Sequence, residues 1–236
     1  MKEISIRSLI RLQRRIADKI DLTDKSPTQP STYCALDAAY SRRYGGVAAA
    51  VACNREGEPL EVRYSVGEAP LRYIPGLLAF REAPLFYTAY LKLETTCDII
   101  LVDGHGISHP RRTGIATHIG MAVKKPTIGV AKSRLVGREA ILDDGARVLR
   151  HHGEIVAVIL THRGKPLYVS QGAYISLQRA VEIVKRLLRP DHYLPAPLYY
   201  ADHYSRVAAR QLDHRAITPE QLRGGGPPPA GITRYL

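Results

Sequence analysis

The chain has 236 residues, enough for one large domain or two small ones, and its 34 Lys and Arg residues outnumber its 22 Asp and Glu residues, a formal net charge of +12. This balance argues against an ordinary metabolic enzyme and favours a polyanionic partner such as nucleic acid, although a merely basic surface would give the same count. No apolar run approaches the roughly 20 residues that cross a bilayer, and the N-terminus lacks the apolar stretch of a signal peptide, so we expect a soluble cytoplasmic protein.

The first third of the chain begins with a helical pattern and continues with strands. Residues 4–20 place apolar side chains at helical spacing between Arg and Lys residues, which predicts a basic amphipathic helix. A polar, proline-containing loop follows at 24–31. Residues 33–40, 47–53 and 60–66 then form apolar runs separated by tight turns, and this spacing predicts an antiparallel meander of three strands.

From residue 76 onward, helical and strand patterns alternate. The predicted helices are 76–94, 114–123, 176–188 and 201–212. The predicted strands are 98–103, 127–131, 154–161 and 167–170. This order predicts a mixed α/β sheet with helices on both faces. No linker inside 32–212 is long enough to divide it, so we expect one domain over residues 1–223 and a mobile, Gly- and Pro-rich tail over 224–236.

The three cysteines carry no motif. Cys34, Cys53 and Cys97 lack the CxxC spacing of a cysteine zinc site. Their number and separation suit a reducing compartment and argue against a disulfide framework. Cys34 and Cys97 lie in apolar runs, so we expect both to be small core residues.

The run 99–112 carries the strongest chemical signal. Four apolar residues end in Asp103, at the place where open α/β sheets bind their ligands. A Gly-His-Gly turn at 104–106 follows, and its glycines allow backbone to approach a ligand closely. His109 and an arginine pair come next, and arginines suit a phosphate partner. His105 and His109 stand four residues apart, which is a spacing that zinc ligands use on a helix. Gly106 and Pro110 prevent a regular helix here, so the case for a zinc site is weak.

Four carboxylates stand on separate predicted elements. Asp37 interrupts an apolar strand, Glu82 lies on the helix 76–94, Asp103 ends a strand, and Asp202 starts the last helix. Three of them have an ordinary alternative: Asp37 could be a solvent-facing strand position, Glu82 a charge neighbour of Arg81, and Asp202 a charge that stabilises the helix dipole. Together they offer the oxygen ligands that Mg²⁺ and Mn²⁺ prefer. Their layout resembles that of the ribonuclease H-like nucleases.

These motifs together resemble endonuclease V, a family of inosine-directed repair nucleases. The matching pieces, in chain order, are 36–40, 72–84, 102–112, 128–135 and 175–177. The resemblance spans roughly residues 33–210 and implies a ribonuclease H-like mixed sheet. Two segments, 170–174 and 195–199, depart from the family pattern. The first departure leaves the role of that loop open, and the second weakens the case for Asp202.

The resemblance also assigns roles to individual residues. The implied metal-binding carboxylates are Asp37, Glu82 and Asp103. The further catalytic positions implied beside the metal and the scissile bond are His109, Lys132 and Asp202. The residues implied to wedge into the duplex are Tyr73, Ile74 and Pro75, which could otherwise form an ordinary packed turn. The residues implied to form a tight pocket for flipped hypoxanthine are Gly76, Leu78, Gly104, Gly106, Ile115 and Leu135.

The activity implied is that of a monomeric, Mg²⁺-dependent endodeoxyribonuclease, for which Mn²⁺ is expected to substitute. It would flip deoxyinosine out of DNA and hydrolyse the second phosphodiester bond 3′ to the lesion, leaving 5′-phosphate ends. A base must leave the stack before it is read, and a mismatch-like pair lowers that cost, while an inserted side chain can fill the gap. Cleavage of inosine-containing RNA and inosine binding without cleavage are the alternatives.

Overall fold

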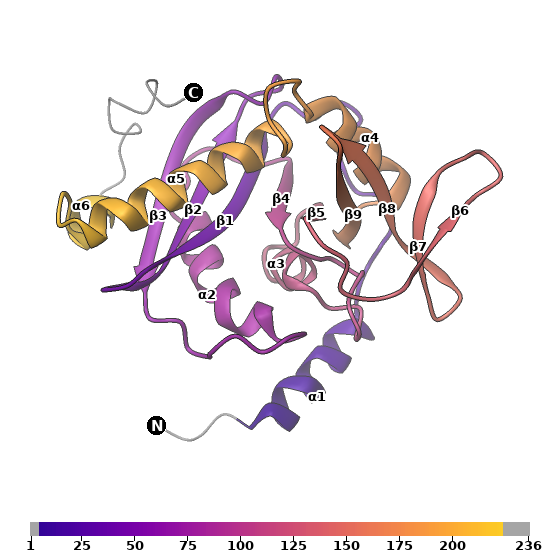
Figure 1. The fold of residues 1–236 in the computed structure, drawn as a ribbon, viewed down its shortest axis with the longest axis horizontal. Coiled ribbons are helices and arrows are strands. Elements are labelled where there is room, and N and C mark those ends of the chain that lie inside the picture. The colour runs from indigo at the N-terminus through magenta and orange to yellow at the C-terminus, as the bar shows by residue number, and fades with distance from the viewer. Residues whose placement is uncertain (1–4, 224–236) are drawn as a thin grey trace.

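The structure, a computed structural model, describes residues 5–223 and is built on a nine-stranded mixed sheet (Figure 1). The sheet order is β3-β2-β1-β4-β5-β9-β8-β7-β6. Its strands are β1 (Tyr33–Ser41), β2 (Gly45–Cys53), β3 (Pro59–Gly67), β4 (Ile99–Asp103), β5 (Thr127–Ala131), β6 (Arg138–Ile141), β7 (Arg147–His151), β8 (Glu154–His162) and β9 (Lys165–Ala173). The helices are α1 (Ile6–Ala17), α2 (Leu78–Tyr90), α3 (Ile115–Val123), α4 (Leu177–Leu187), α5 (Ala196–Asp213) and α6 (Pro219–Arg223).

The topology brings the carboxyl ends of three strands to one edge. β1, β2 and β3 form the predicted antiparallel meander, whereas β1, β4 and β5 run parallel to one another. The residues 99–102 of β4 are all fully buried, as expected for a strand covered on both faces. Asp103 therefore ends β4 at the same edge where β1 and β5 end.

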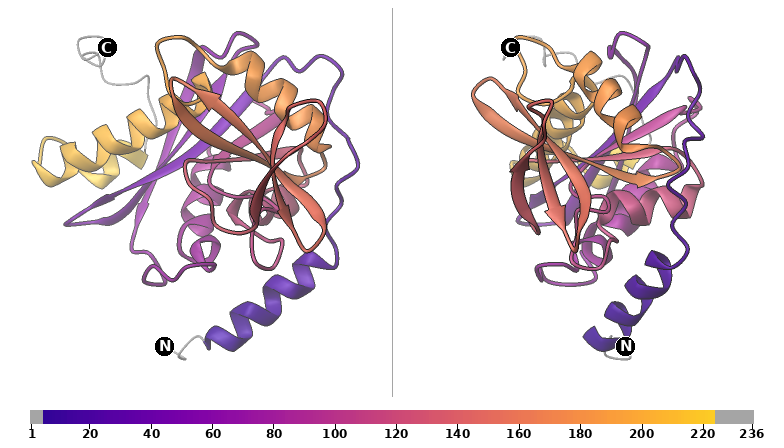
Figure 2. Two further views of the ribbon diagram at one scale, coloured as in Figure 1. Left: turned by 45° about the vertical axis from the view of Figure 1, so that its right-hand side comes forward. Right: turned by 90° about the vertical axis from the view of Figure 1, so that its right-hand side faces the viewer.

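Helices cover both faces of the sheet, as the sequence predicted. On one face α4, α5 and α6 enclose a core, and α5 lies across β1, β2 and β3 (Figure 1). On the other face α2 and α3 pack against β1, β2 and β4 through Phe86 and Ile119. A smaller core lies beneath β7, β8 and β9 and takes in Ile20 and Leu22 after α1. α1 itself extends away from the sheet (Figure 2), and of its residues only Gln13 is buried.

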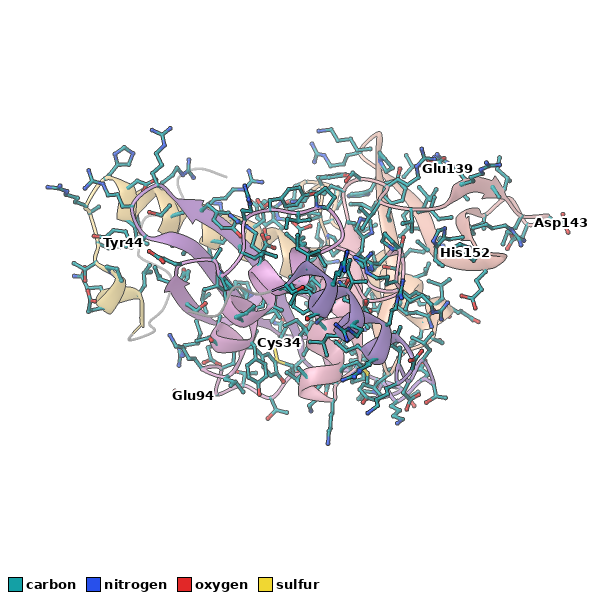
Figure 3. All side chains as sticks on the ribbon, turned by 90° about the horizontal axis from the view of Figure 1, so that it is seen from below. Cys34, Tyr44, Glu94, Glu139, Asp143 and His152 are labelled. Atoms are coloured by element: carbon teal, nitrogen blue, oxygen red, sulfur yellow. A yellow bond between two sulfur atoms is a disulfide. The ribbon has the colours of Figure 1, made fainter. Side chains whose placement is uncertain are left out.

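Some elements differ from the sequence predictions. The hairpin of β6 and β7 was not predicted because β6 is charged and largely exposed, which leaves no apolar run to mark it. Its loops carry Asp143 and His152, which Figure 3 shows far from Tyr44. α5 begins at Ala196, ahead of the predicted 201, because proline is tolerated in the first turn of a helix. The expected tail at 224–236 lies outside the described residues.

Cys34 and Cys97 are buried in the core, as predicted, but the expectation that they form no disulfide is wrong. Cys34 in β1 and Cys97, just before β4, form a disulfide with their Cα atoms 5.6 Å apart (Figure 3). The parallel pairing of β1 with β4 brings them together, which their separation of 63 residues in the sequence did not indicate. Cys53 is buried with a free thiol. In the described part of the chain, no helix is both long and apolar enough to span a membrane.

Candidate active site

Three aspartates from separate elements meet at the carboxyl edge of the sheet. Asp37 and Asp103 each follow a paired residue of β1 and β4, so both side chains project from the same face. That face is the one covered by α5, and α5 carries Asp202. One carboxylate oxygen of each aspartate lies within 4.8 Å of those of the other two. The structure thus places Asp202 in the compact acidic group, although the sequence departure at 195–199 weakened its case.

Lys132 follows β5 directly and lies against this acidic group. Its Nζ is 2.6 Å from Oδ2 of Asp103 and 3.1 Å from Oδ1 of Asp202. Burial alone would lower the pKa of Lys132, but the neighbouring charges of Asp103 and Asp202 outweigh burial and raise it. Arg206, one turn further along α5, also reaches Asp202, with 2.9 Å between Nη2 and Oδ1. The ammonium group therefore already occupies a position among the carboxylates where a cation is favoured.

The three carboxylates of the acidic group outnumber the two cations, Lys132 and Arg206, that form ion pairs with them. Burial raises the pKa of Asp37 well above its usual range, and the charge of Asp103 raises it further. Burial also raises the pKa of Asp103, with Lys132 opposing the shift. Carboxylate oxygens are the ligands that Mg²⁺ and Mn²⁺ prefer. The donor set and its unbalanced charge fit a divalent cation of this kind.

Glu82 stands apart from the compact group because α2 packs on the opposite face of the sheet from α5. Burial raises the pKa of Glu82 to about 7, an effect that a hydrogen bond from Tyr40 partly offsets. The Tyr40 hydroxyl donates to Oε1 of Glu82 at 3.0 Å and accepts from Nε of Arg81 at 2.7 Å. Glu82 still lines the same cavity as Asp37 and Asp103, so it faces the acidic group from the other side.

A cavity of about 450 Å³ adjoins the acidic group. Besides Asp37, Glu82, Asp103 and Lys132, the sequence-predicted residues that line it are Tyr73, Gly76, Leu78, Gly104, His109, Ile115 and Leu135. At its rim the Tyr73 side chain is 62% exposed. Of the predicted residues, all within the described chain, those that do not line the cavity are Ile74, Pro75, Gly106 and Asp202.

The two glycines of the 104–106 turn have different roles. Gly104 has a φ of +144°, and a Cβ there would lie 2.6 Å from Cγ2 of Ile115, so glycine keeps this part of the cavity open. Gly106 does not line the cavity and packs against β9, where a Cβ would overlap the backbone of Gln171. The N–H of Gly104 donates to Val130, and that of Gly106 to Oγ of Ser170. Both N–H groups are therefore already engaged within the protein.

The segment 170–174, whose role the sequence left open, supports this turn. Oγ of Ser170 accepts the Gly106 N–H at 2.9 Å, and the carbonyl of Gln171 accepts the Ile107 N–H at 2.7 Å. Both residues belong to β9, which pairs with β5. The divergent segment therefore fixes the backbone between the acidic group and the cavity.

His109 is engaged with the loop that follows Tyr73. Its ring is buried, and burial lowers its pKa to about 3, so it is neutral near pH 7. Nδ1 accepts from the backbone N–H of Arg111, which leaves Nε2 to donate to the carbonyl of Gly76 at 3.0 Å. Nη2 of Arg111 and Nε2 of Gln13 donate to the same carbonyl, at 2.7 and 3.0 Å. His109 thus holds Gly76 in place.

Gln13 and Arg111 belong to this network and were not assigned a role from the sequence. Nε of Arg111 donates to Oε1 of Gln13 at 2.5 Å. The available signal was the position of Gln13, a polar residue on the apolar face of the helix predicted over 4–20. Arg111 was expected only to suit a phosphate, but its side chain is directed to Gly76.

Comparisons with known proteins agree with this geometry. The family model described as endonuclease V matches residues 14–203. The chain is 43% identical over 200 residues to endonuclease V of Desulfurococcus amylolyticus, covering 83% of this chain and 90% of that protein. It is 41% identical over 199 residues to endonuclease V of Aeropyrum pernix, covering 84% and 77%.

Solved structures give the same result. Endonuclease V from Streptomyces avermitilis matches with a TM-score of 0.80 at 30% identity, covering 89% of this chain and 95% of that one. Ciona intestinalis endonuclease V, in complex with a 24mer DNA containing an inosine followed by a ribo-adenosine, matches with a TM-score of 0.77 at 25% identity, covering 88% and 98%. The chain therefore belongs to the endonuclease V family and has the ribonuclease H-like fold that its sequence predicted.

Proposed function

We propose that this chain is a monomeric DNA repair endonuclease that takes deoxyinosine out of the duplex and, with Mg²⁺, hydrolyses the second phosphodiester bond 3′ to it. The observation that carries the proposal is the acidic group at one side of a cavity whose rim presents Tyr73. Family membership supports a nuclease, and the Ciona intestinalis relative bound to inosine-containing DNA supports a deaminated base as the lesion.

Asp37, Glu82 and Asp103, the metal ligands predicted from the sequence, would hold the metal from the two sides of the cavity. Asp202 would complete the set from α5. Burial, together with the neighbouring carboxylates, raises the pKa of Asp37 and Asp103, and a divalent cation would stabilise their charged forms. Mg²⁺ held there would activate a water for attack on phosphorus and stabilise charge on the leaving 3′ oxygen. Breaking the bond between phosphorus and that oxygen would leave a 3′-hydroxyl and a 5′-phosphate. Mn²⁺ prefers similar oxygen ligands and is proposed to substitute.

The remaining residues bind and position the nucleic acid. The exposed ring of Tyr73, followed by Ile74 and Pro75, would fill the gap that a flipped nucleotide leaves in the stack. Leu78, Ile115 and Leu135 offer apolar contacts to the flipped base, and Gly104 leaves room for it. Lys132 provides a positive charge beside the acidic group that can neutralise a phosphate. His109 acts as a positioning residue, because it holds the loop that begins at Tyr73.

A nicking assay tests the proposal directly. The substrate is an inosine-containing DNA oligonucleotide in Mg²⁺, and the proteins are wild type and Asp103→Ala. Loss of a metal ligand removes several kcal/mol of transition-state stabilisation, so we expect nicking to fall by roughly 1,000-fold. Lys124→Ala, at the opposite end of β5 from Lys132, serves as the control and should nick at the wild-type rate. Equal activity of wild type and Asp103→Ala would overturn the assignment.

Inosine-containing RNA is the second candidate substrate. The ligand of the Ciona intestinalis protein supports this candidate, because a ribo-adenosine follows the inosine in it. Contact with the 2′-hydroxyl is what lets a protein distinguish RNA from DNA. Nicking rates on matched DNA and RNA oligonucleotides, measured side by side, separate the two substrates. Binding of inosine DNA without cleavage in either Mg²⁺ or Mn²⁺ would instead identify a non-cleaving inosine-binding protein.

A further inference from the structure

The N-terminal helix α1 carries a basic face that the rest of the protein does not use. Arg7, Arg11, Arg14 and Arg15 are all exposed. At 3.6 residues per turn they fall within an arc of roughly 100°. The helix has no acidic side chain. Within residues 5–223, none of the four arginines takes part in an ion pair. This cluster is called the α1 basic face below.

α1 is attached to the loop that presents Tyr73. Gln13 lies on the opposite side of the helix from the α1 basic face and is fully buried. Its Nε2 donates to the carbonyl of Gly76 at 3.0 Å, three residues after Tyr73. Figure 2 shows that α1 projects from the body of the protein. A duplex held at Tyr73 therefore has the projecting helix beside it.

Positive charge also gathers where α1 meets this loop. Burial lowers the pKa of Arg111, and the nearby charge of Arg14 lowers it further. The Arg111 guanidinium is held by Gln13 and Gly76, so it cannot move away from Arg14 without losing hydrogen bonds. Fixed like charges without a carboxylate partner produce a positive potential that attracts anions.

We propose that α1 is a nucleic-acid-binding arm, and that the α1 basic face contacts phosphates of the duplex that flanks the base extracted at Tyr73. The inference rests on the proposed function, which supplies the duplex. The charge of the helix favours this polyanion over an apolar partner. Its exposed apolar side chains, Ile6 and Leu12, are 48% and 45% exposed and lie apart from the arginines on the helix.

The test compares the full chain with the variant R7Q/R11Q/R14Q/R15Q. Fluorescence anisotropy in EDTA measures binding to a 30-base-pair duplex, with and without one inosine, at several salt concentrations. We expect the variant to bind both duplexes roughly tenfold more weakly at low salt. The slope of log K against log [salt] should become shallower by about 1 for each arginine that contacts a phosphate.

Two controls separate charge from folding. The variant R7K/R11K/R14K/R15K keeps the charge and should keep the wild-type salt slope. K124A/K125A removes two positive charges at the amino end of β5, away from Tyr73, and should leave affinity and slope unchanged.

An unchanged salt slope in the glutamine variant would overturn the proposal. The proposal would also be overturned if the glutamine variant kept its duplex binding but lost binding to phosphatidylserine vesicles. That result would assign the helix to a membrane surface. The duplex without inosine reports on α1 whether or not the enzyme cleaves. Wild type that binds duplex but never nicks inosine DNA would refute the proposed function and leave the result for α1 standing.

Discussion

Reducing the disulfide between Cys34 and Cys97 should lower the stability of the protein substantially. The bond ties β1 to the residues that lead into β4, across 63 residues of sequence. Both side chains are buried, so the reduced thiols keep most of their packing in the folded state. The main effect is therefore on the unfolded chain, which gains conformational freedom when the loop is opened.

The magnitude follows from the length of the closed loop. A loop of 63 residues restricts the unfolded chain by about 14 cal/mol/K, or about 4 kcal/mol at 25 °C. Unfolding entropy near 2.1 cal/mol/K per residue gives a total of about 500 cal/mol/K for a chain of this length. Reduction should consequently lower Tm by about 9 °C.

Circular dichroism of the oxidised and the phosphine-reduced protein measures this shift. Alkylation in denaturant without reductant should modify one cysteine, Cys53, and alkylation after reduction should modify all three. Cys53→Ala, which leaves the cross-link in place, should show the same dependence on reductant. A Tm that moves by less than about 2 °C on reduction, or three reactive thiols before it, would refute the reasoning.

Three further predictions concern single side chains. Asp202→Asn should reduce nicking of inosine DNA by about 100-fold, because it removes one carboxylate of the acidic group; nicking at the wild-type rate would show that this carboxylate is dispensable. Gln13→Leu should lower the free energy of unfolding by about 1–3 kcal/mol, because buried polar partners lose a hydrogen bond, and denaturant unfolding that matches wild type would contradict it. Burial lowers the pKa of His118 to about 4, below its ordinary 6.5, so the unfolded chain takes up the proton first and stability is lost as pH falls from 6.5 towards 4. At pH 5 the free energy of unfolding should be lower by about 2 kcal/mol than with His118 neutral in both states. The midpoints of guanidinium unfolding at pH 7 and pH 5 should therefore differ less for His118→Leu than for wild type.

The sequence predicted those parts of the fold whose burial leaves a pattern. β4 and β5 are covered on both faces and read as short apolar runs, and the meander shows strands separated by tight turns. β6 leaves no such pattern because it is charged and largely exposed, and β7 buries only Val148 and Leu149. The disulfide depends on which strands become neighbours, and that information is absent from local spacing.

The site was predictable to a similar extent. Asp37 and Asp103 could be identified because each is a carboxylate within or at the end of an apolar strand. The grouping of Asp202 with them, while Glu82 stands apart, depends on which face of the sheet each helix covers. Gln13 is remote in sequence from the loop it holds, so its hydrogen bond to Gly76 required the folded structure.

The distribution of the acidic group along the chain couples the site to folding. Asp37 and Asp103 stand on β1 and β4, whereas Asp202 stands on α5. A chain whose strands have paired but whose α5 has not yet packed on the sheet therefore lacks the third carboxylate. The acidic group is complete only in the assembled protein, so a partly folded chain cannot present the full set of cation ligands.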